Sequence, residues 1–188
     1  MKLNKNPKKP IDMPKLKSPF IRKEINNQYV CTPKINKDYS WVFTKESTAI
    51  EKLDGTNISI VIENKTITQI YNRKNRIDIW KKGSKIYAQG ILETIDRQYF
   101  KPNHMLDGQY FGELIGARIN GNQYHQDNPI WLPFYHLEQN YRYKFWENFV
   151  KELDGLKDHE IYEKMVLGLN HVVAQAETLS AKDVCSTP

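Results

Sequence analysis

The residues best suited to chemistry lie in the stretch 49–60, AIEKLDGTNISI. Lys52 ends an apolar run, an Asp-Gly turn follows at once, and the alternating apolar pattern of residues 58–62 predicts a strand. Ordered backbone on both sides would fix the base of the side chain, while the turn leaves its amine at an open edge. A lysine nucleophile needs this rigid placement, together with surroundings that keep part of it as the free amine. The alternative interpretation is a β-hairpin turn with a solvated lysine beside it.

Two further charged residues fall where they could contact a phosphorylated ligand. Arg73 follows a predicted two-strand meander over residues 58–63 and 66–71. Its planar guanidinium could hold a phosphate at two points, although a surface arginine would look the same in the sequence. Glu113 lies inside the strand-like run 109–116, QYFGELIG. A carboxylate that faces a core needs a partner, which could be a ribose hydroxyl or a structural arginine.

An aromatic-rich run over residues 130–137 predicts another strand. Trp131, Phe134 and Tyr135 offer flat surfaces against which a purine base could stack. Aromatic residues on a strand usually belong to the core, and at least one of the three is expected to do so.

Two motifs resemble those of the covalent nucleotidyltransferases, the superfamily of polynucleotide ligases and capping enzymes. The pattern E-K-x-D-G-T-N-x-S of residues 51–59 is similar to the nucleotidyl-lysine motif, in the form that the RNA ligases of the strand-repair type carry. The pattern F-G-E-L-x-G of residues 111–116 looks like the family's third motif, whose glutamate contacts the nucleotide sugar. The resemblance implies an ATP-grasp-like nucleotidyltransferase fold, ATP with Mg²⁺ as cofactors, and a nucleic-acid partner, RNA in preference to DNA.

The resemblance also implies a role for each matching residue. Lys52 would be the catalytic nucleophile on the α-phosphate of ATP, and Asp54 would shape the turn and support it. Glu51 would border the adenine pocket, and Asn57 would help to hold phosphates. Tyr135 is the expected stacking partner of adenine by its place in the pattern, where the family usually continues Phe-Asp and this chain has Tyr-His. The expected nucleotide-binding set is Glu51, Lys52, Asn57, Arg73, Glu113 and Tyr135, and no metal ligand is assigned.

Two motifs of the family have no counterpart in the sequence: an E-G-x-V-x-K strand with a metal-associated carboxylate and a K-x-K strand that grips phosphates. We therefore expect residues 19–188 to be a nucleotidyltransferase (RNA ligase) domain that lacks the C-terminal motifs, either truncated and weakly active or completed by a separate chain. The enzyme would join 5′-phosphate to 3′-hydroxyl ends. A DNA ligase, a capping-type enzyme and a non-catalytic nucleotide- or nucleic-acid-binding module remain open alternatives.

Composition sets broader limits. With 188 residues, 39% of them hydrophobic, the chain is long enough for one globular core, and its net charge of +6 favours polyanionic partners. No apolar run approaches about 18 residues, so no transmembrane helix is expected. Cys31 and Cys185 fit no zinc spacing and suggest reduced thiols, so we expect a cytoplasmic protein. Residues 1–18, rich in lysine and proline, predict a basic flexible arm.

The pattern along the rest of the chain predicts an α+β fold, a mainly antiparallel sheet with flanking helices. Apolar spacing that includes Ile91, Leu92 and Ile95 predicts a helix over residues 87–100. The other expected elements are a strand over residues 41–43, helices over 143–156 and 161–169, a strand over 171–176 and a helical turn over 180–185.

Overall fold

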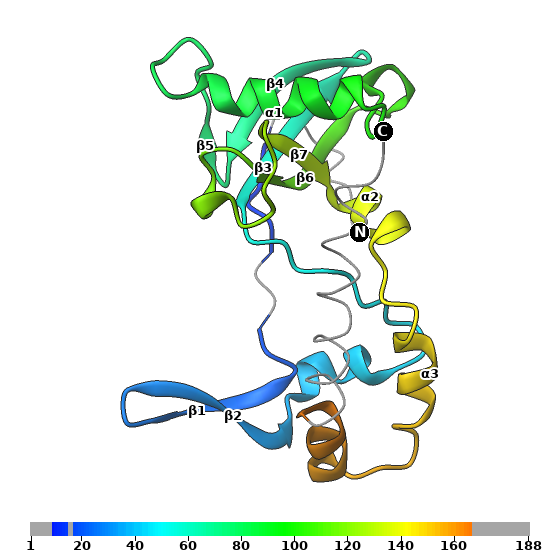
Figure 1. Ribbon diagram of the computed structural model, residues 1–188. Coiled ribbons are helices and arrows are strands. Elements are labelled where there is room, and N and C mark those ends of the chain that lie inside the picture. Colours follow the sequence, from blue (N-terminus) through cyan, green and yellow to red (C-terminus); the bar gives the residue numbers. More distant parts are fainter. Residues whose placement is uncertain (1–8, 15–16, 167–188) are drawn as a thin grey trace. The chain divides into compact units, whose positions relative to one another are not determined.

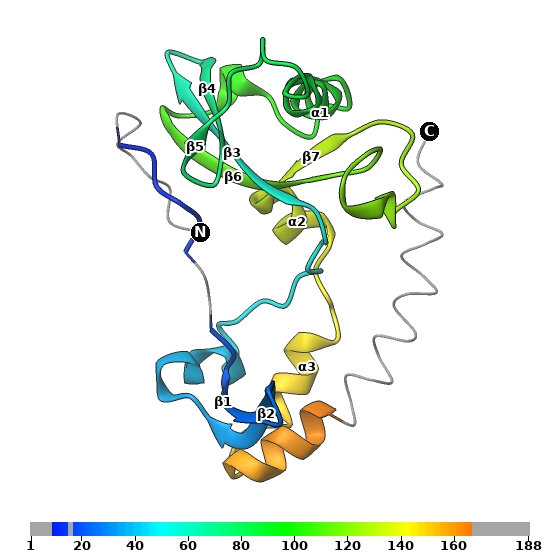
Figure 2. The same ribbon diagram turned by 90° about the vertical axis from the view of Figure 1, so that its left-hand side faces the viewer.

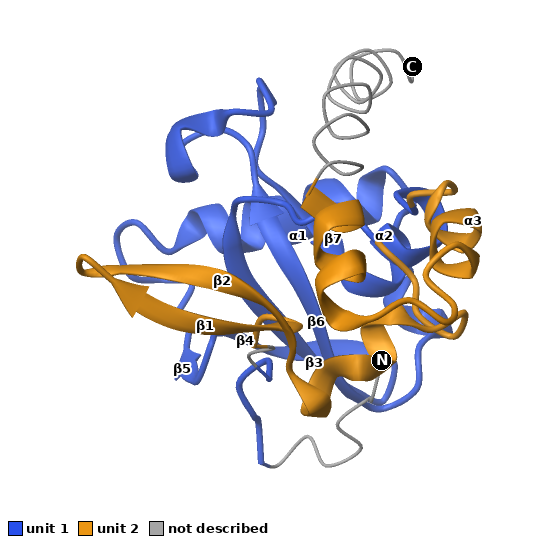
Figure 3. Cartoon of the chain, turned by 90° about the horizontal axis from the view of Figure 1, so that it is seen from below, with its two compact units in different colours: residues 1–14, 50–142 blue, residues 15–49, 143–188 orange. Residues whose placement is uncertain are grey.

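The computed structural model describes residues 9–14 and 17–166, which belong to two compact units (Figures 1 and 3). Unit 1 comprises residues 1–14 and 50–142, and unit 2 comprises residues 15–49 and 143–188. The sequence was interpreted as one domain over residues 19–188. Each unit is assembled from two segments that are distant in the sequence.

Unit 1 contains a five-stranded antiparallel sheet in the order β5-β4-β3-β6-β7. This arrangement confirms the predicted α+β class with a mainly antiparallel sheet. The central strand, β3, is rich in isoleucine, valine and threonine, which favour the pleated conformation. The strands are β3 (Thr56–Glu63), β4 (Thr66–Asn72), β5 (Asn75–Arg76), β6 (Gly108–Ile115) and β7 (Ile130–Pro133).

The predicted meander is the β3–β4 hairpin. Its two-residue turn, Asn64-Lys65, has positive φ at both positions, 50° and 63°. Positive φ at both central residues is the requirement of the type I′ turn, whose twist matches that of the flanking strands. The turn therefore helps to set the register between β3 and β4, and with it the face of the sheet on which each β3 side chain lies.

One face of the sheet is covered by the helix α1 (Lys85–Asp96), as Figure 2 shows. The core beneath this helix receives every second side chain of β3, namely Ile58, Ile60 and Ile62. The helix is shorter than the predicted 87–100, and Leu92, expected to face the core, is 59% exposed. The buried residues of this core are Ile58, Ile60, Ile62, Ile91, Phe100, Leu114, Ile119 and Trp131.

The other face of the sheet carries Ser59 and Gln109, and residues 9–14 lie against it. The fully buried Gln109 amide accepts a hydrogen bond from the Ile11 N–H (2.9 Å) and donates to the Ile11 carbonyl (2.8 Å). The Gln109 amide also donates to Ser59 Oγ (2.8 Å). Residues 9–14 were expected to be part of a flexible arm, but Ile11 is hydrogen-bonded to the sheet through Gln109. A buried amide needs such partners.

The predicted aromatic strand 130–137 is a short strand followed by a helix. β7 ends at Pro133, and α2 (Phe134–Asn140) begins at the next residue. Proline has no N–H to donate to a ladder and its fixed φ, here −62°, suits the start of a helix. Tyr135 consequently projects from a helix and not from the sheet.

Unit 2 contains the hairpin of β1 (Phe20–Ile25) and β2 (Gln28–Ile35) and the helix α3 (Trp146–Lys151). The predicted strand 41–43 is wrong, because these residues end the 3₁₀ helix η1 (Lys37–Phe43). Residues 158–166 are also helical, whereas the predictions for 171–176 and 180–185 lie outside the described residues. Two short 3₁₀ helices of unit 1, η2 (Pro102–His104) and η3 (Asn120–Asn122), complete the elements.

Candidate functional site

The Lys52 turn lies against β6 in unit 1. The Leu53 side chain is buried in a small apolar cluster, while Lys52 and Asp54 on either side of it are exposed. Gly55 approaches β6 so closely that a Cβ there would lie 2.8 Å from Ile115 Cγ2 and 2.9 Å from Glu113 Cγ. The backbone carbonyl oxygen of Leu114 would lie closer still, so a side chain at residue 55 would push the turn away from the strand, and glycine allows the close approach.

Two residues that the sequence analysis did not single out hold the turn in place. The hydroxyl of Tyr124 accepts a hydrogen bond from the Asp54 N–H (2.7 Å). The Asn120 amide donates to Asp54 Oδ1 (3.1 Å) and to the Gly55 carbonyl (2.8 Å). The only local signal was the Asn-Gly-Asn run at residues 120–122, which indicates a turn but not what it contacts.

Glu113 is brought to the same place by the register of the sheet. It is the partner of Asn57 in the β3–β6 ladder, so both side chains project from the same face. Burial raises the pKa of the half-buried Glu113 carboxyl. Hydrogen bonds from the Gly55 N–H and the Asn57 amide and the charge of Lys52 act in the opposite direction, and the charge of Asp54 raises the pKa further.

The Asn57 side chain has an acceptor to spare. Its Oδ1 atom is buried and has no hydrogen-bond partner. An unpaired buried oxygen costs free energy, and a ligand hydroxyl that donates to it would remove that cost. Since the Asn57 amide faces the Glu113 carboxylate, the two side chains offer adjacent acceptors for a ligand with two hydroxyls.

Glu51 lies beside a group of aromatic side chains. Its N–H donates to the Tyr141 carbonyl (3.2 Å), and burial raises the pKa of its carboxyl. Burial and then the charges of Tyr99 and Glu51 raise the pKa of Tyr141. The Tyr99 and His136 rings are stacked with centroids 4.4 Å apart, and burial lowers the pKa of His136. The sequence analysis missed this aromatic group, whose members come from two segments, Tyr99 from the residues after α1 and His136 and Tyr141 from α2 and its end.

Tyr135, the expected stacking residue, is half-buried and packs against the core under α1. Its ring is 6.3 Å from that of Phe100, and its hydroxyl donates to the Tyr99 carbonyl (3.1 Å). Burial raises the pKa of Tyr135 to about 12. The core residues with which it packs include Ile58 and Leu114, which alternate with Asn57 and Glu113 and so face the other side of the sheet.

Arg73 is exposed and stands just after β4. Its N–H donates to the Asn57 carbonyl (3.4 Å), and its guanidinium lies 3.9 Å from the Asp12 carboxylate, a contact that the sequence analysis did not foresee. The backbone at Arg73 has φ of 55°, as expected in the tight turn between β4 and β5. The structure therefore ties Arg73 to Asn57 through the backbone while its side chain is directed to Asp12.

The described residues do not build a metal site of their own. Among them, no group of three or more His, Cys, Asp and Glu side chains could hold an ion. Mg²⁺ commonly binds through one or two carboxylates and the phosphates of a substrate. Of the two carboxylates near the turn, Asp54 accepts a hydrogen bond from Asn120, and the Asn57 side chain acts on Glu113. In addition, the described helices include none long and apolar enough to cross a membrane.

Of the predicted set, Asn57 and Glu113 are partners in the ladder, and the charges of Lys52 and Asp54 act on the Glu113 carboxyl. Glu51 precedes Lys52 in the chain. Arg73 and Tyr135 have the other partners described above. Comparison of the chain with protein-family models, with curated proteins and with solved structures found no match. The contacts around Gly55 are therefore the basis for a functional proposal.

Proposed function

We propose that this chain carries an ATP-dependent nucleotidyltransferase site of the RNA-ligase type, with Lys52 as the nucleophile. The observation that supports it best is the half-buried Glu113 carboxyl, whose pKa the positive charge of Lys52, the Gly55 N–H and the Asn57 side chain lower against the effect of burial. The residue types match a site for a nucleoside triphosphate, because an amine stands next to acceptors that suit sugar hydroxyls.

In the proposed reaction the free amine of Lys52 attacks the α-phosphorus of ATP. A phosphorus–nitrogen bond forms, the bond to the pyrophosphate oxygen breaks in line with it, and the amine loses a proton to solvent. The AMP group would then pass to a 5′-phosphate, and a 3′-hydroxyl would displace it to seal the two ends.

The surrounding residues would position the reactants. Glu113 and the free Oδ1 of Asn57 would accept hydrogen bonds from the ribose hydroxyls. Asn120 and Tyr124 would keep the turn, and with it the base of Lys52, in a fixed place. Such preorganisation matters because a small displacement of the amine from the line of attack lowers the rate steeply.

Labelling with α-³²P-ATP tests the proposal. The full chain should form a covalent adduct that survives alkali and is cleaved by acid, as a phosphorus–nitrogen bond is. Lys52→Ala should abolish it, whereas Lys65→Ala, at an exposed lysine in the β3–β4 turn, should retain it. Label retained in Lys52→Ala would refute the assignment. ATP binding without any adduct would indicate a nucleotide-binding module.

A further inference from the structure

A second site of unit 1 lies between the start of β3, the loop before α1 with the first turns of that helix, and the segment that follows β6. It is a pocket of about 840 Å³. Its walls include basic and aromatic side chains from segments that are far apart in the sequence. They are Trp80, Lys82, Lys85, Tyr87 and Arg118, and the polar Asn120 also lines the pocket.

The pocket is strongly positive. Lys82, Lys85 and Arg118 line it, and its lining residues include no aspartate or glutamate. Within the described part of the chain, none of the three forms an ion pair with a carboxylate. Like charges gathered in a concave surface repel one another, and their field attracts an anion. Three separate cations suit a ligand that carries several negative charges spaced apart.

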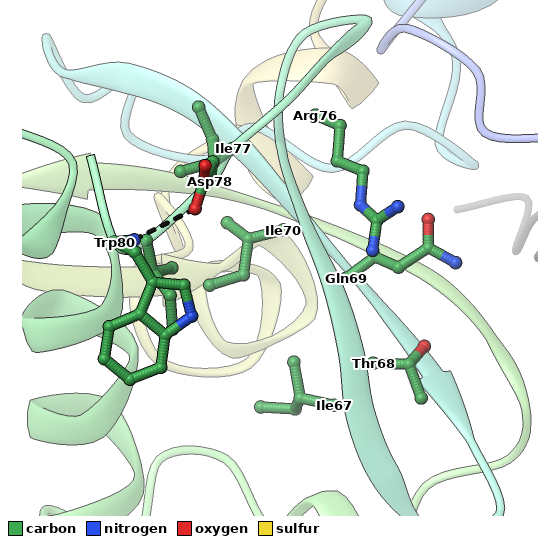
Figure 4. A pocket seen from close by; sticks show the side chains of 9 residues that line it. Ile67, Thr68, Gln69, Ile70, Arg76, Ile77, Asp78 and Trp80 are labelled. Atoms are coloured by element: carbon green, nitrogen blue, oxygen red, sulfur yellow. Dashed lines mark hydrogen bonds between the residues drawn. The ribbon is translucent and has the colours of Figure 1, made fainter.

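Trp80 adds an aromatic surface at the edge of this pocket. Its side chain is 85% exposed, although burial of an indole would be favourable. It also lines a neighbouring pocket, in which Figure 4 shows it on the same side of β4 as Ile67 and Ile70. The backbone N–H of Trp80 donates to Asp78 Oδ1 (3.1 Å), and this hydrogen bond fixes the backbone of the loop. An exposed ring on a fixed backbone is suited to stacking against a flat partner.

The pocket adjoins the Lys52 turn. Thr56 and Asn120 both line it. Thr56 follows Gly55 directly, and the Asn120 amide donates to Asp54 and to the Gly55 carbonyl. An extended polymeric ligand bound in the pocket would therefore lie next to the turn that carries Lys52.

We infer that this pocket binds a single-stranded polynucleotide, with phosphates on Lys82, Lys85 and Arg118 and a base stacked on Trp80. Regularly spaced phosphates match the separate cations, and a base matches the exposed indole. The binding itself follows from the pocket alone. Its purpose, to present an end of the strand to Lys52, rests on the proposed function.

Fluorescence anisotropy of labelled RNA and DNA oligonucleotides of identical sequence and about 12 nucleotides tests the inference, since single-strand sites span roughly 4–16 nucleotides. The experiment uses the full chain without ATP. Trp80→Ala should weaken binding about tenfold or more, the loss expected for one stacked base. Trp80→Phe should recover most of the affinity. Trp41→Ala is the matched control, because Trp41 is 50% exposed and belongs to unit 2.

The salt dependence of binding tests the phosphate contacts. The triple variant Lys82→Ala, Lys85→Ala, Arg118→Ala should bind more weakly, and the slope of log K against log salt should flatten by about 2, or roughly 0.7 per lost contact on a single strand. The control triple variant changes Arg22, Lys65 and Lys101, which are exposed and lie outside the pocket. This control variant should change the slope of log K against log salt less than the pocket triple variant does.

The outcomes separate this inference from the proposed function. Unchanged affinity in both Trp80→Ala and the pocket triple variant would overturn the inference, whatever the result of ATP labelling. Tight binding that depends on the pocket, in a chain that forms no adduct, would support the inference and refute the nucleotidyltransferase proposal. Equal affinity for the two oligonucleotides would assign the site to single strands in general, and stronger RNA binding to RNA.

Discussion

Asn57 and Glu113 stand opposite each other in the β3–β6 ladder, and the Asn57 side chain is close enough to the Glu113 carboxyl to lower its pKa. The pair lies on the face of the sheet opposite the core under α1. Because the ladder sets their separation, their two acceptor groups keep a fixed spacing without support from a loop. A rigid element is the better support for a site that must position a sugar precisely.

The Glu113→Gln variant should separate binding from stability. Burial raises the pKa of Glu113, so the folded chain holds a proton at pH values where the unfolded chain, near 4.5, has lost it. The free energy of unfolding therefore falls as the pH rises through the folded-state pKa. Glutamine lacks this titration, so the variant should be at least as stable as the parent at neutral pH, while ATP labelling is strongly reduced.

Urea denaturation at neutral and at acidic pH, combined with labelling, checks this prediction. Any stability advantage of Glu113→Gln over the parent should shrink as the pH falls below the pKa of an unperturbed glutamate. A variant that unfolds readily at neutral pH would instead assign Glu113 a purely structural role.

The close approach of Gly55 to β6 predicts a large effect of the smallest substitution. In Gly55→Ala the new methyl group would meet Ile115 and Glu113, at 2.8 and 2.9 Å, so the turn must move away from the strand. We expect a loss of about 1–3 kcal/mol in the free energy of unfolding, as for other overpacked sites. Gly83→Ala is the control, because its Cβ would meet nothing within 4 Å and only its φ of 86° opposes the change. Equal losses in the two variants, by urea denaturation, would contradict the packing argument.

Tyr124 should matter through the Asp54 N–H. Tyr124→Phe removes the acceptor of that hydrogen bond and should cost about 1 kcal/mol of stability. Amide hydrogen exchange at Asp54 should become faster, and the yield of the Lys52 adduct should fall at unchanged ATP affinity. Tyr29→Phe, at a tyrosine that is 71% exposed in unit 2, should change none of these. Unchanged exchange at Asp54 would show that the turn is held by other contacts.

Local patterns predicted the parts of the site that local forces determine. The alternation of residues 58–62 gave β3, and the single acidic residue of β6 indicated a carboxylate that needs a partner. Contacts across about 66 residues, such as that of Asn120 with Asp54, have no comparable signal. Tyr135 was misplaced because Pro133 ends the strand two residues earlier, and that shift moves the side chain onto a helix. The division into two units likewise depends on long-range packing.

Gln109 provides the last test, which concerns residues 9–14. Its buried amide makes two hydrogen bonds to the Ile11 backbone and one to Ser59. Gln109→Leu should lower the free energy of unfolding by about 1–3 kcal/mol, because it leaves buried polar groups without partners. Ser59→Ala removes only one of these contacts and should cost less. In hydrogen-exchange measurements the Ile11 amide should be protected in the parent and in Ser59→Ala, and should exchange rapidly in Gln109→Leu. An Ile11 amide that exchanges at the rate of an unfolded peptide in the parent would restore the expectation that this segment is a flexible arm.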